Sequence, residues 1–140
     1  KFYGLPGLRC GFGFIGKGHD QFLSYTNKYL GYNRFSEAVA LAALDSHDHY
    51  RKVADEMEWD RQLFKKELGS RPGFKVYKSV ANFILIKYPT EIKERLQKAL
   101  GEQDYKIKFM SDKGLEDCLR ITLGRKEQIQ TVVDTIKSLL

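Results

Sequence analysis

The sequence predicts an α/β protein whose C-terminal half is a small α+β unit, and three patterns lead to this prediction. After Arg71-Pro72-Gly73 the apolar residues stop recurring at helical spacing and begin to alternate. Further alternating segments follow, with an amphipathic stretch between them, and the chain ends in an apolar stripe at helical spacing. The predicted order is strand–strand–helix–strand–strand–helix, which corresponds to a small antiparallel sheet covered by helices on one face.

The beginning of the chain predicts helix and loop with little core. Segment 8–15 mixes glycine with aromatic and β-branched residues, so it is expected to be a strand or a loop leading into one. A polar helix is expected over 19–30. Its candidate core contacts are Phe22, Leu23 and Tyr29.

Two further helices are expected before the alternating region. Ser36 is a candidate N-cap for an alanine-rich helix over 37–44. A longer helix over 50–68 follows from apolar residues at helical spacing, and Gly69 is expected to end it.

The alternating region predicts the strands of the sheet. Phe74 and Val76 share one face of a short first strand, and 82–88 is a more buried second strand. The third strand is expected over 105–109, where Tyr105, Ile107 and Phe109 alternate with Lys106 and Lys108. In 118–123 one face carries Leu119, Ile121 and Leu123, and the other carries Cys118, Arg120 and Thr122.

Two amphipathic helices complete this unit. The first begins at Pro89-Thr90 and has Ile92, Leu96 and Leu100 on one side. The second ends the chain, with the stripe Ile129, Val132, Val133, Ile136 and Leu140.

Composition limits the possible partners and location. The 140 residues are 42% hydrophobic and 30% charged, and no apolar run is long enough to span a membrane. The net charge of +6 comes from lysines interspersed with acids, which is typical of a solvated helix face and not of a nucleic-acid surface. Cys10 and Cys118 are expected to be buried free thiols. Together with an N-terminus unlike a signal peptide, they favour a reduced, cytoplasmic setting.

Two apparent motifs are better explained by structure than by chemistry. Residues 11–16 fit the GxGxxG pattern of dinucleotide-binding loops, but phenylalanines alternate with the glycines as in a strand, and Gly18 stands where the phosphate-binding helix should start. We therefore interpret these glycines as strand packing. His47 and His49 point in different directions on a helix. The segment 46–49 is therefore expected to be a polar helix junction capped by Ser46 or Asp48, and no metal site is predicted.

Three basic residues have a context that suggests chemistry. Arg9 follows a glycine-bounded turn, where backbone N–H groups and a guanidinium could converge on an anion such as phosphate. Arg120 lies on the strand face opposite Leu119 and Ile121, so it is expected to project toward a cleft, where its guanidinium suits a carboxylate. Lys108 has the same disposition on its own strand.

Three stretches of this sequence resemble fold-type-I enzymes that use pyridoxal 5'-phosphate (PLP), in particular the histidinol-phosphate aminotransferase branch. Residues 1–12, KFYGLPGLRCGF, are similar to the stretch that begins at the lysine to which the cofactor is bound. Residues 118–124, CLRITLG, are similar to the strand that carries the substrate-binding arginine. Residues 81–85, ANFIL, are similar to a small-domain strand with an Asn-aromatic pair. Order and spacing agree along the whole chain.

The resemblance implies a role for each matching residue. Lys1 would bind PLP covalently and, when freed, move a proton to and from the substrate α-carbon. Arg9 would hold the cofactor phosphate. Arg120 would bind the substrate carboxylate, with Lys108 near the far anionic end of the substrate and Asn82 as a further substrate contact.

The resemblance also implies an organisation and partners. Residues 1–49 would end the large PLP-binding domain, 50–70 would be a connecting helix, and 71–140 would form the small C-terminal α+β domain. The substrates would be an amino donor and a 2-oxo acid, and the intact protein would be a homodimer. The cofactor-ring contacts of the family lie upstream of Lys1, so this segment alone is expected to be inactive.

Two other functions remain open at this point. The lysine-to-arginine stretch is also similar to threonine-phosphate decarboxylases, which have the same fold and cofactor. A non-catalytic binding module made from the small domain is the third possibility. It predicts that Arg120 can be replaced without loss of function.

Overall fold

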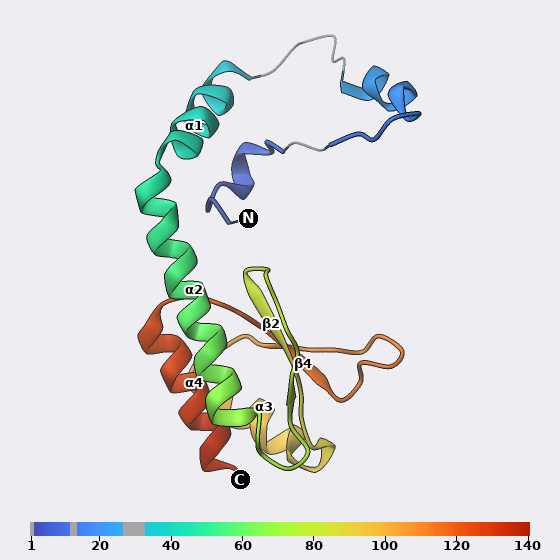
Figure 1. Ribbon diagram of the computed structural model, residues 1–140. Coiled ribbons are helices and arrows are strands. Elements are labelled where there is room, and N and C mark those ends of the chain that lie inside the picture. Colours follow the sequence, from blue (N-terminus) through green and yellow to red (C-terminus); the bar gives the residue numbers. More distant parts are fainter. Residues whose placement is uncertain (1, 12–13, 27–32) are drawn as a thin grey trace. The chain divides into compact units, whose positions relative to one another are not determined.

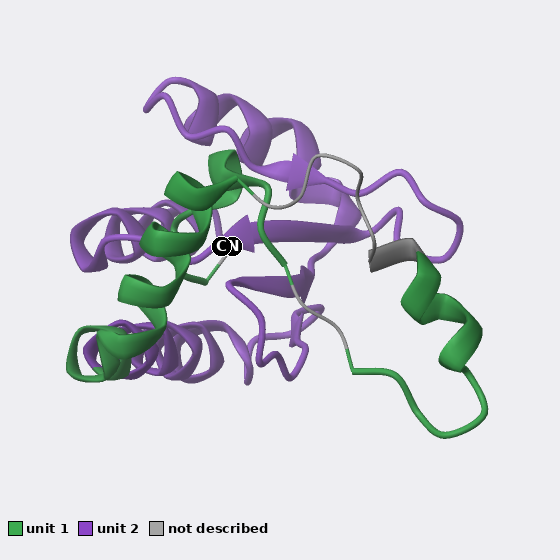
Figure 2. Ribbon diagram, turned by 90° about the horizontal axis from the view of Figure 1, so that it is seen from above, with its two compact units in different colours: residues 1–51 green, residues 52–140 purple. Residues whose placement is uncertain are grey.

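The computed structural model describes residues 2–11, 14–26 and 33–140. They divide into two compact units, Lys1–Arg51 and Lys52–Leu140 (Figure 2). Lys1 and Tyr29, for which the sequence predicts a catalytic and a core role, lie outside the described residues. The division into 1–49, 50–70 and 71–140 stays a prediction about the intact protein.

The second unit contains a four-stranded antiparallel sheet, and its order confirms the predicted fold class. The strands are β1 (Lys75–Val76), β2 (Phe83–Lys87), β3 (Lys108–Phe109) and β4 (Cys118–Thr122). Their spatial order is β1-β2-β4-β3, so the two longer strands lie side by side at the centre (Figure 1). The pairing of β2 with β4 runs from Phe83 opposite Thr122 to Lys87 opposite Cys118.

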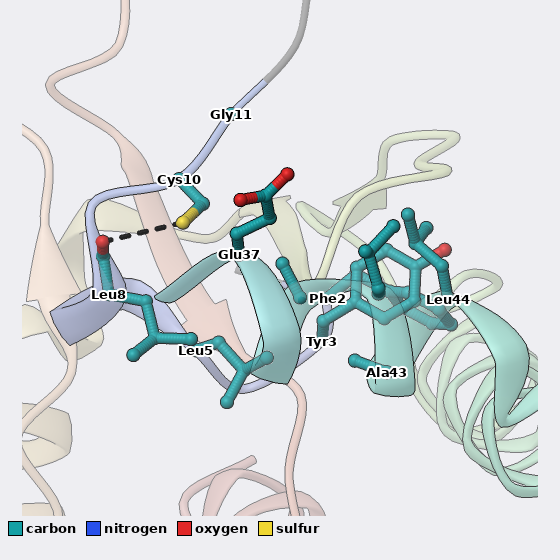
Figure 3. Close-up of a pocket in the computed structure, with 11 residues that line it drawn as sticks. Phe2, Tyr3, Leu5, Leu8, Cys10, Gly11, Glu37, Ala43 and Leu44 are labelled. Atoms are coloured by element: carbon teal, nitrogen blue, oxygen red, sulfur yellow. Dashed lines mark hydrogen bonds between the residues drawn. The ribbon is translucent and has the colours of Figure 1, made fainter. Parts of the chain in front are cut away.

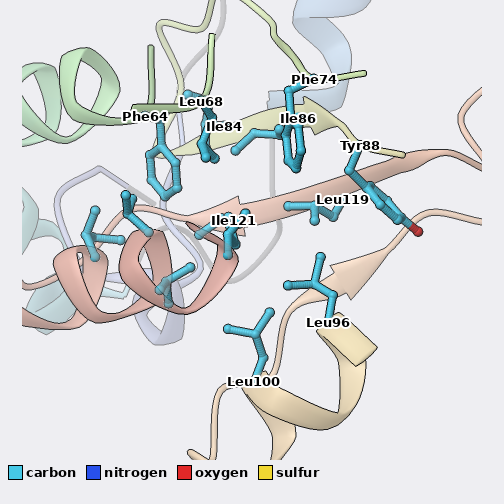
Figure 4. Packing of buried hydrophobic residues seen from close by; sticks show 14 of the residues in the cluster. Phe64, Leu68, Phe74, Ile84, Ile86, Tyr88, Leu96, Leu100, Leu119 and Ile121 are labelled. Carbon is cyan, nitrogen blue, oxygen red and sulfur yellow. The ribbon is translucent and has the colours of Figure 1, made fainter. Parts of the chain in front are cut away.

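Alternation places the buried aliphatic residues of the two central strands on one face, as the sequence predicted. Ile84, Ile86, Leu119 and Ile121 are at most 3% exposed and face the helices. Phe64 and Leu68 of α2 (His47–Leu68) pack on them, together with Leu96 and Leu100 of α3 (Lys93–Gly101) (Figure 4). The final helix, α4 (Lys126–Ser138), adds Ile129, Val132, Val133 and Ile136. Because each of these side chains leaves water, this cluster is the main source of folding free energy in the unit.

Four details of the second unit differ from the sequence prediction. The third strand, expected over 105–109, is limited to Lys108–Phe109. Helix α2 begins at His47, three residues before the expected start, and Ser46 lies at its junction with α1 (Arg34–Asp45). A short 3-10 turn, η3 (Thr90–Ile92), precedes α3. Leu140 is 52% exposed, because α4 ends at Ser138 and the stripe is completed by the partly buried Leu139.

The first unit has almost no core among its described residues, as predicted. Its elements are the 3-10 turns η1 (Pro6–Leu8) and η2 (Asp20–Thr26) and the helix α1. Only Ser36 and Ala43 are buried in this part of the described chain. No strand occurs in the described part of 8–15, so the expected strand is absent there.

Two predictions for the first unit are wrong. Phe22 and Leu23, expected to be core contacts of a helix, are 49% and 51% exposed on η2. The N-cap of α1 is Asn33, whose side-chain oxygen accepts a hydrogen bond from the backbone N–H of Ser36 at 3.1 Å. Asparagine and serine are both good caps, so composition alone did not distinguish these positions.

Candidate functional site

The outer face of the sheet in the second unit carries Arg120, Lys108 and Leu85. The register places Arg120 of β4 opposite Leu85 of β2 and opposite Lys108 of β3. Since opposite residues of antiparallel strands project from the same face, the three side chains form one row across the sheet. The structure therefore brings Arg120 and Lys108 together on the face away from the core.

This row carries two positively charged side chains. Lys108 is exposed and Arg120 is half-buried. Like charges directly opposite each other on a sheet repel, so the arrangement is unfavourable without an anion. Within the described chain neither residue forms an ion pair. The row can therefore accept a carboxylate or phosphate group with both cations available.

Phe83 lies beside Arg120 on the same face. The guanidinium carbon of Arg120 is 5.2 Å from the centroid of the Phe83 ring, which is cation–π distance. Sequence analysis noted Phe83 only as the aromatic residue of the Asn-aromatic pair and did not predict its contact with Arg120. The available signal was alternation, which places Phe83 and Leu85 on one face of β2, opposite the face of Ile84.

The turn before β2 is fixed by hydrogen bonds. Ser79 Oγ donates to the carbonyl oxygen of Phe83 at 2.6 Å, and Asn82 O accepts from the backbone N–H of Leu123 at 3.0 Å. From α2, Arg61 Nη2 donates to the carbonyl oxygen of Ala81 at 2.8 Å. Asn82, a predicted substrate contact, thus stands at the start of β2, one residue before Phe83.

At the other end of β2, Lys87 forms an ion pair with Asp117. Lys87 Nζ lies 2.5 Å from Asp117 Oδ2. The hydrogen bond from Lys87 lowers the pKa of the Asp117 carboxyl, and the same contact raises the pKa of Lys87. Burial, followed by the hydrogen bond to Asp117, raises the pKa of the Cys118 thiol, so Cys118 is a protonated structural thiol.

Arg9 lies in the first unit, at the end of η1. Its φ of 53° is in the left-handed region, and Gly4 before the turn also has a positive φ of 67°. The Arg9 side chain is exposed, and its Nη1 donates to the carbonyl oxygen of Pro6 at 3.4 Å, a long hydrogen bond. Most of the guanidinium donors are therefore available to an anion.

The segment between Lys1 and Arg9 is held by aromatic side chains. Tyr50 Oη donates to the carbonyl oxygen of Tyr3 at 3.2 Å, and the two rings lie edge to face, 4.6 Å apart. The ring of Phe2 packs on both. Tyr50, the first residue of the helix expected over 50–68, therefore anchors the residues that directly follow Lys1.

An apolar cavity of about 500 Å³ lies between this segment and α1 (Figure 3). Its lining comes from the two segments 2–11 and 37–44, and the Cys10 thiol points to the carbonyl oxygen of Leu8 at 3.4 Å. Cys10 and Cys118 are both free, as predicted, but only Cys118 is buried, so the predicted burial of Cys10 is wrong. The residues that line it are Phe2, Tyr3, Leu5, Leu8, Cys10, Gly11, Glu37, Ala40, Leu41, Ala43 and Leu44.

A second cavity, of about 570 Å³, lies between α2 and the start of α4. Asp60 lines it, is only 2% exposed, and has no hydrogen-bond partner for Oδ2. Burial raises the pKa of Asp60 to about 6, and a backbone hydrogen bond from Gly124 acts in the opposite direction. Sequence reasoning missed Asp60, because an acid in a strongly charged helix gives no sign of burial.

Neither metal nor membrane is indicated by the described residues. In 2–11, 14–26 and 33–140 no group of three His, Cys, Asp or Glu side chains is arranged to hold a metal ion. Over the same ranges no helix combines the length and the apolar character needed to cross a bilayer.

The sequence matches a family model, described as aminotransferase class I and II, over residues 1–136. The chain belongs to this family. One relative, histidinol-phosphate aminotransferase 1 of Nostoc sp., is 36% identical over 143 residues, which include 100% of this chain and 39% of the relative. The resemblance seen in the motifs is thus confirmed at the level of the family.

Solved structures agree with the fold. Histidinol-phosphate aminotransferase from Sinorhizobium meliloti, in complex with pyridoxal-5'-phosphate, has a TM-score of 0.77 and 22% identity, and covers 100% of this chain and 40% of its own. L-threonine-O-3-phosphate decarboxylase from Porphyromonas gingivalis has a TM-score of 0.69 and 25% identity, with 98% of this chain and 43% of its own covered. The chain spans 38% to 40% of the length of the first three curated relatives it matches.

Proposed function

We propose that the protein containing this chain is a PLP-dependent aminotransferase. It would exchange an amino group between a 2-oxo acid and an amino compound with an anionic tail. The observation that carries the proposal is the pair Arg120 and Lys108, two cations without ion pairs in the described chain, side by side on the outer face of the sheet. The names of the relatives, histidinol-phosphate aminotransferases, suggest a phosphate as that tail.

Arg120 is proposed to bind the α-carboxylate of the amino acid or 2-oxo acid. Its planar fork can donate two parallel hydrogen bonds to one carboxylate and so fix the orientation of the α-carbon. Lys108, as its neighbour in the row, is proposed to contact the second anionic group of the substrate. Asn82 is proposed as a further substrate contact because it directly precedes Phe83 at the start of β2.

Arg9 and Lys1 are proposed to hold the cofactor. The exposed guanidinium of Arg9, at the end of a left-handed turn, suits a phosphate dianion in charge and geometry. When bound, PLP supplies the electron sink for the bond broken at the α-carbon. The amine of Lys1 is proposed to bind the cofactor covalently and, once freed, to move a proton at the α-carbon.

Borohydride trapping tests this assignment. The intact protein and the 140-residue chain are incubated with PLP and reduced, and the adduct is located by peptide mass mapping. A pyridoxyl group on the side chain of Lys1 in the intact protein is expected. Arg9→Ala should lower the yield of this adduct about tenfold or more. Arg51→Ala is the matched control, because Arg51 has a highly exposed side chain and no proposed role. Labelling spread over many lysines and indifferent to Arg9 would contradict the proposal.

Decarboxylation is the second candidate, because the threonine-phosphate decarboxylase structure covers 98% of this chain. Carbon dioxide release and exchange with a 2-oxo acid are different products, so a product assay on the intact protein separates the two reactions. A non-catalytic module predicts neither product and predicts no effect of Arg120→Ala.

We further propose that the intact protein is a cytoplasmic homodimer. The free thiols of Cys10 and Cys118 suit a reduced compartment. Phe35, Leu41 and Leu44 of α1 are 72%, 55% and 41% exposed, so α1 offers apolar surface for association. Sedimentation equilibrium of the intact protein, with Leu41→Ser as a variant, tests the dimer.

A further inference from the structure

The Arg120 guanidinium lies against an aromatic ring, and among the described residues it forms no ion pair with an acid. Phe83 is opposite Thr122, two residues from Arg120 along β4, so ring and guanidinium are diagonal neighbours on the outer face. Diagonal pairs on a sheet are within reach when one side chain is aromatic and the other is long. The observed 5.2 Å between the guanidinium carbon and the ring centroid is such a contact.

An aromatic neighbour leaves the hydrogen-bond donors of Arg120 available, whereas an acidic neighbour would not. An acid beside Arg120 would occupy its N–H donors, cancel its charge and compete with a substrate carboxylate. A ring attracts the cation through its negative face and takes none of the in-plane donors. In the described residues no acid forms an ion pair with Arg120, so its fork stays available while its position is fixed.

The other neighbours of Arg120 favour the same position. Lys108, opposite Arg120 on β3, repels the guanidinium from one side. Phe83 attracts it from the β2 side. The two effects act in the same direction, away from Lys108 and toward the ring.

The position of Phe83 is itself well defined by its backbone. Ser79 Oγ donates to Phe83 O, and the preceding residues are held by Arg61 of α2 and by the backbone N–H of Leu123. These bonds hold the backbone at Phe83 and at the two residues before it, and so fix the direction in which the side chain leaves the strand. A supporting residue of a binding site requires such a fixed backbone.

We propose that Phe83 is the positioning residue for Arg120, and that it increases the affinity for substrates that present a carboxylate to that arginine. This inference rests on the proposed aminotransferase function. It adds a residue, Phe83, that contacts no reacting atom and acts through Arg120.

The test measures KM and kcat of the intact, PLP-loaded protein with 2-oxoglutarate as the probe acid. Phe83→Leu is expected to raise KM about three- to tenfold and to leave kcat within about twofold, because the lost contact aids binding in ground state and transition state alike. Phe83→Tyr should restore the wild-type KM. Tyr77→Leu is the matched control, because it removes a ring whose cation–π contact is with Lys75 and not with Arg120.

Two further variants separate positioning from packing. Pentafluorophenylalanine at position 83 keeps the ring shape and reverses its quadrupole, so a raised KM is expected even if Phe83→Leu folds poorly. In an Arg120→Gln background, Phe83→Leu should have no further effect on KM. A wild-type KM with the fluorinated ring, or a full additional effect of Phe83→Leu in that background, overturns the inference.

The outcomes also separate this inference from the proposed function. If Arg120→Gln raises KM and the Phe83 variants do not, only the role of Phe83 is wrong. If Arg120→Gln leaves KM unchanged, the proposed role of Arg120 is wrong and the inference is overturned with it.

Discussion

At the scale of single residues, Asp60 makes the stability of the second unit depend on pH. Its pKa is raised from 3.8 to about 6 in the fold, chiefly by burial. Between these values the unfolded chain binds fewer protons than the native chain, so the free energy of unfolding falls as pH rises. The full effect is about two pKa units at roughly 1.4 kcal/mol each, or about 3 kcal/mol at most.

We therefore expect Asp60→Asn to become more stabilising, relative to wild type, as pH rises from 4 to 8. Urea unfolding followed by circular dichroism measures the difference at both pH values. The gain should be small at pH 4, where the wild-type acid is protonated in the fold, and about 2–3 kcal/mol larger at pH 8. A difference that is the same at both values would show that Asp60 keeps an ordinary pKa.

The two cysteines should differ in reactivity. Cys118 is 1% exposed and its pKa is raised by burial, whereas Cys10 is half-buried beside a cavity. Thiolates react and thiols do not, so a disulfide reagent at pH 8 should modify Cys10 at least about tenfold faster than Cys118. Cys10→Ser should remove the fast phase and Cys118→Ser the slow one, and urea should make both thiols fast. Equal rates in the folded wild type would contradict this prediction.

At the scale of elements, two glycines test how the loops around the sheet are built. Gly73 has a φ of 78°, and a Cβ there would lie 2.7 Å from Pro89 Cγ. Gly114 has a similar φ of 82° and nothing within 4 Å of the Cβ position. Gly114→Ala should cost about 1–2 kcal/mol for the left-handed backbone alone. Gly73→Ala should cost about 2–4 kcal/mol, because a collision is added. Urea midpoints measure both, and equal losses would argue against the contact with Pro89.

The elements also show what the sequence could and could not reveal. Helix α4 and strand β2 were predicted because a large part of each is buried on one face, which leaves a clear period in the residues. The prediction that Phe22 and Leu23 contact the core was wrong, because an apolar pair in a short segment does not show whether a core lies beside it. The prediction that Leu140 belongs to the apolar stripe of the last helix was wrong for a different reason. A helix frays in its last turn, so periodicity does not fix where the helix ends.

The same limit applies to the candidate site. Arg120 was predicted to face away from the core by alternation alone, and the register then placed Lys108 beside it. The contact of Phe83 with Arg120 was missed because it depends on which strand pairs with β2, and that pairing joins segments far apart in sequence. The role of Lys1 remains a prediction from the resemblance, since this residue lies outside the described residues.

At the scale of the whole molecule, the two units should differ in independence. The second unit contains nearly all of the buried apolar side chains, while Ser36 and Ala43 are the only buried residues in the described part of 1–51. A fragment 47–140, which keeps α2 complete, should unfold cooperatively in urea, and 1–46 alone should show no cooperative transition. Limited proteolysis of the 140-residue chain should first cleave before residue 47. Early cleavage within 75–123 would contradict this division.

The shortness of β1 and β3 affects how molecules of this chain meet one another. Each outer strand pairs over only two residues and begins with a lysine, Lys75 or Lys108. A short, charged edge strand gives a neighbouring molecule few free backbone groups to pair with, and two edge strands of like charge repel each other. The short, charged outer strands thus protect the sheet against growth into fibrils.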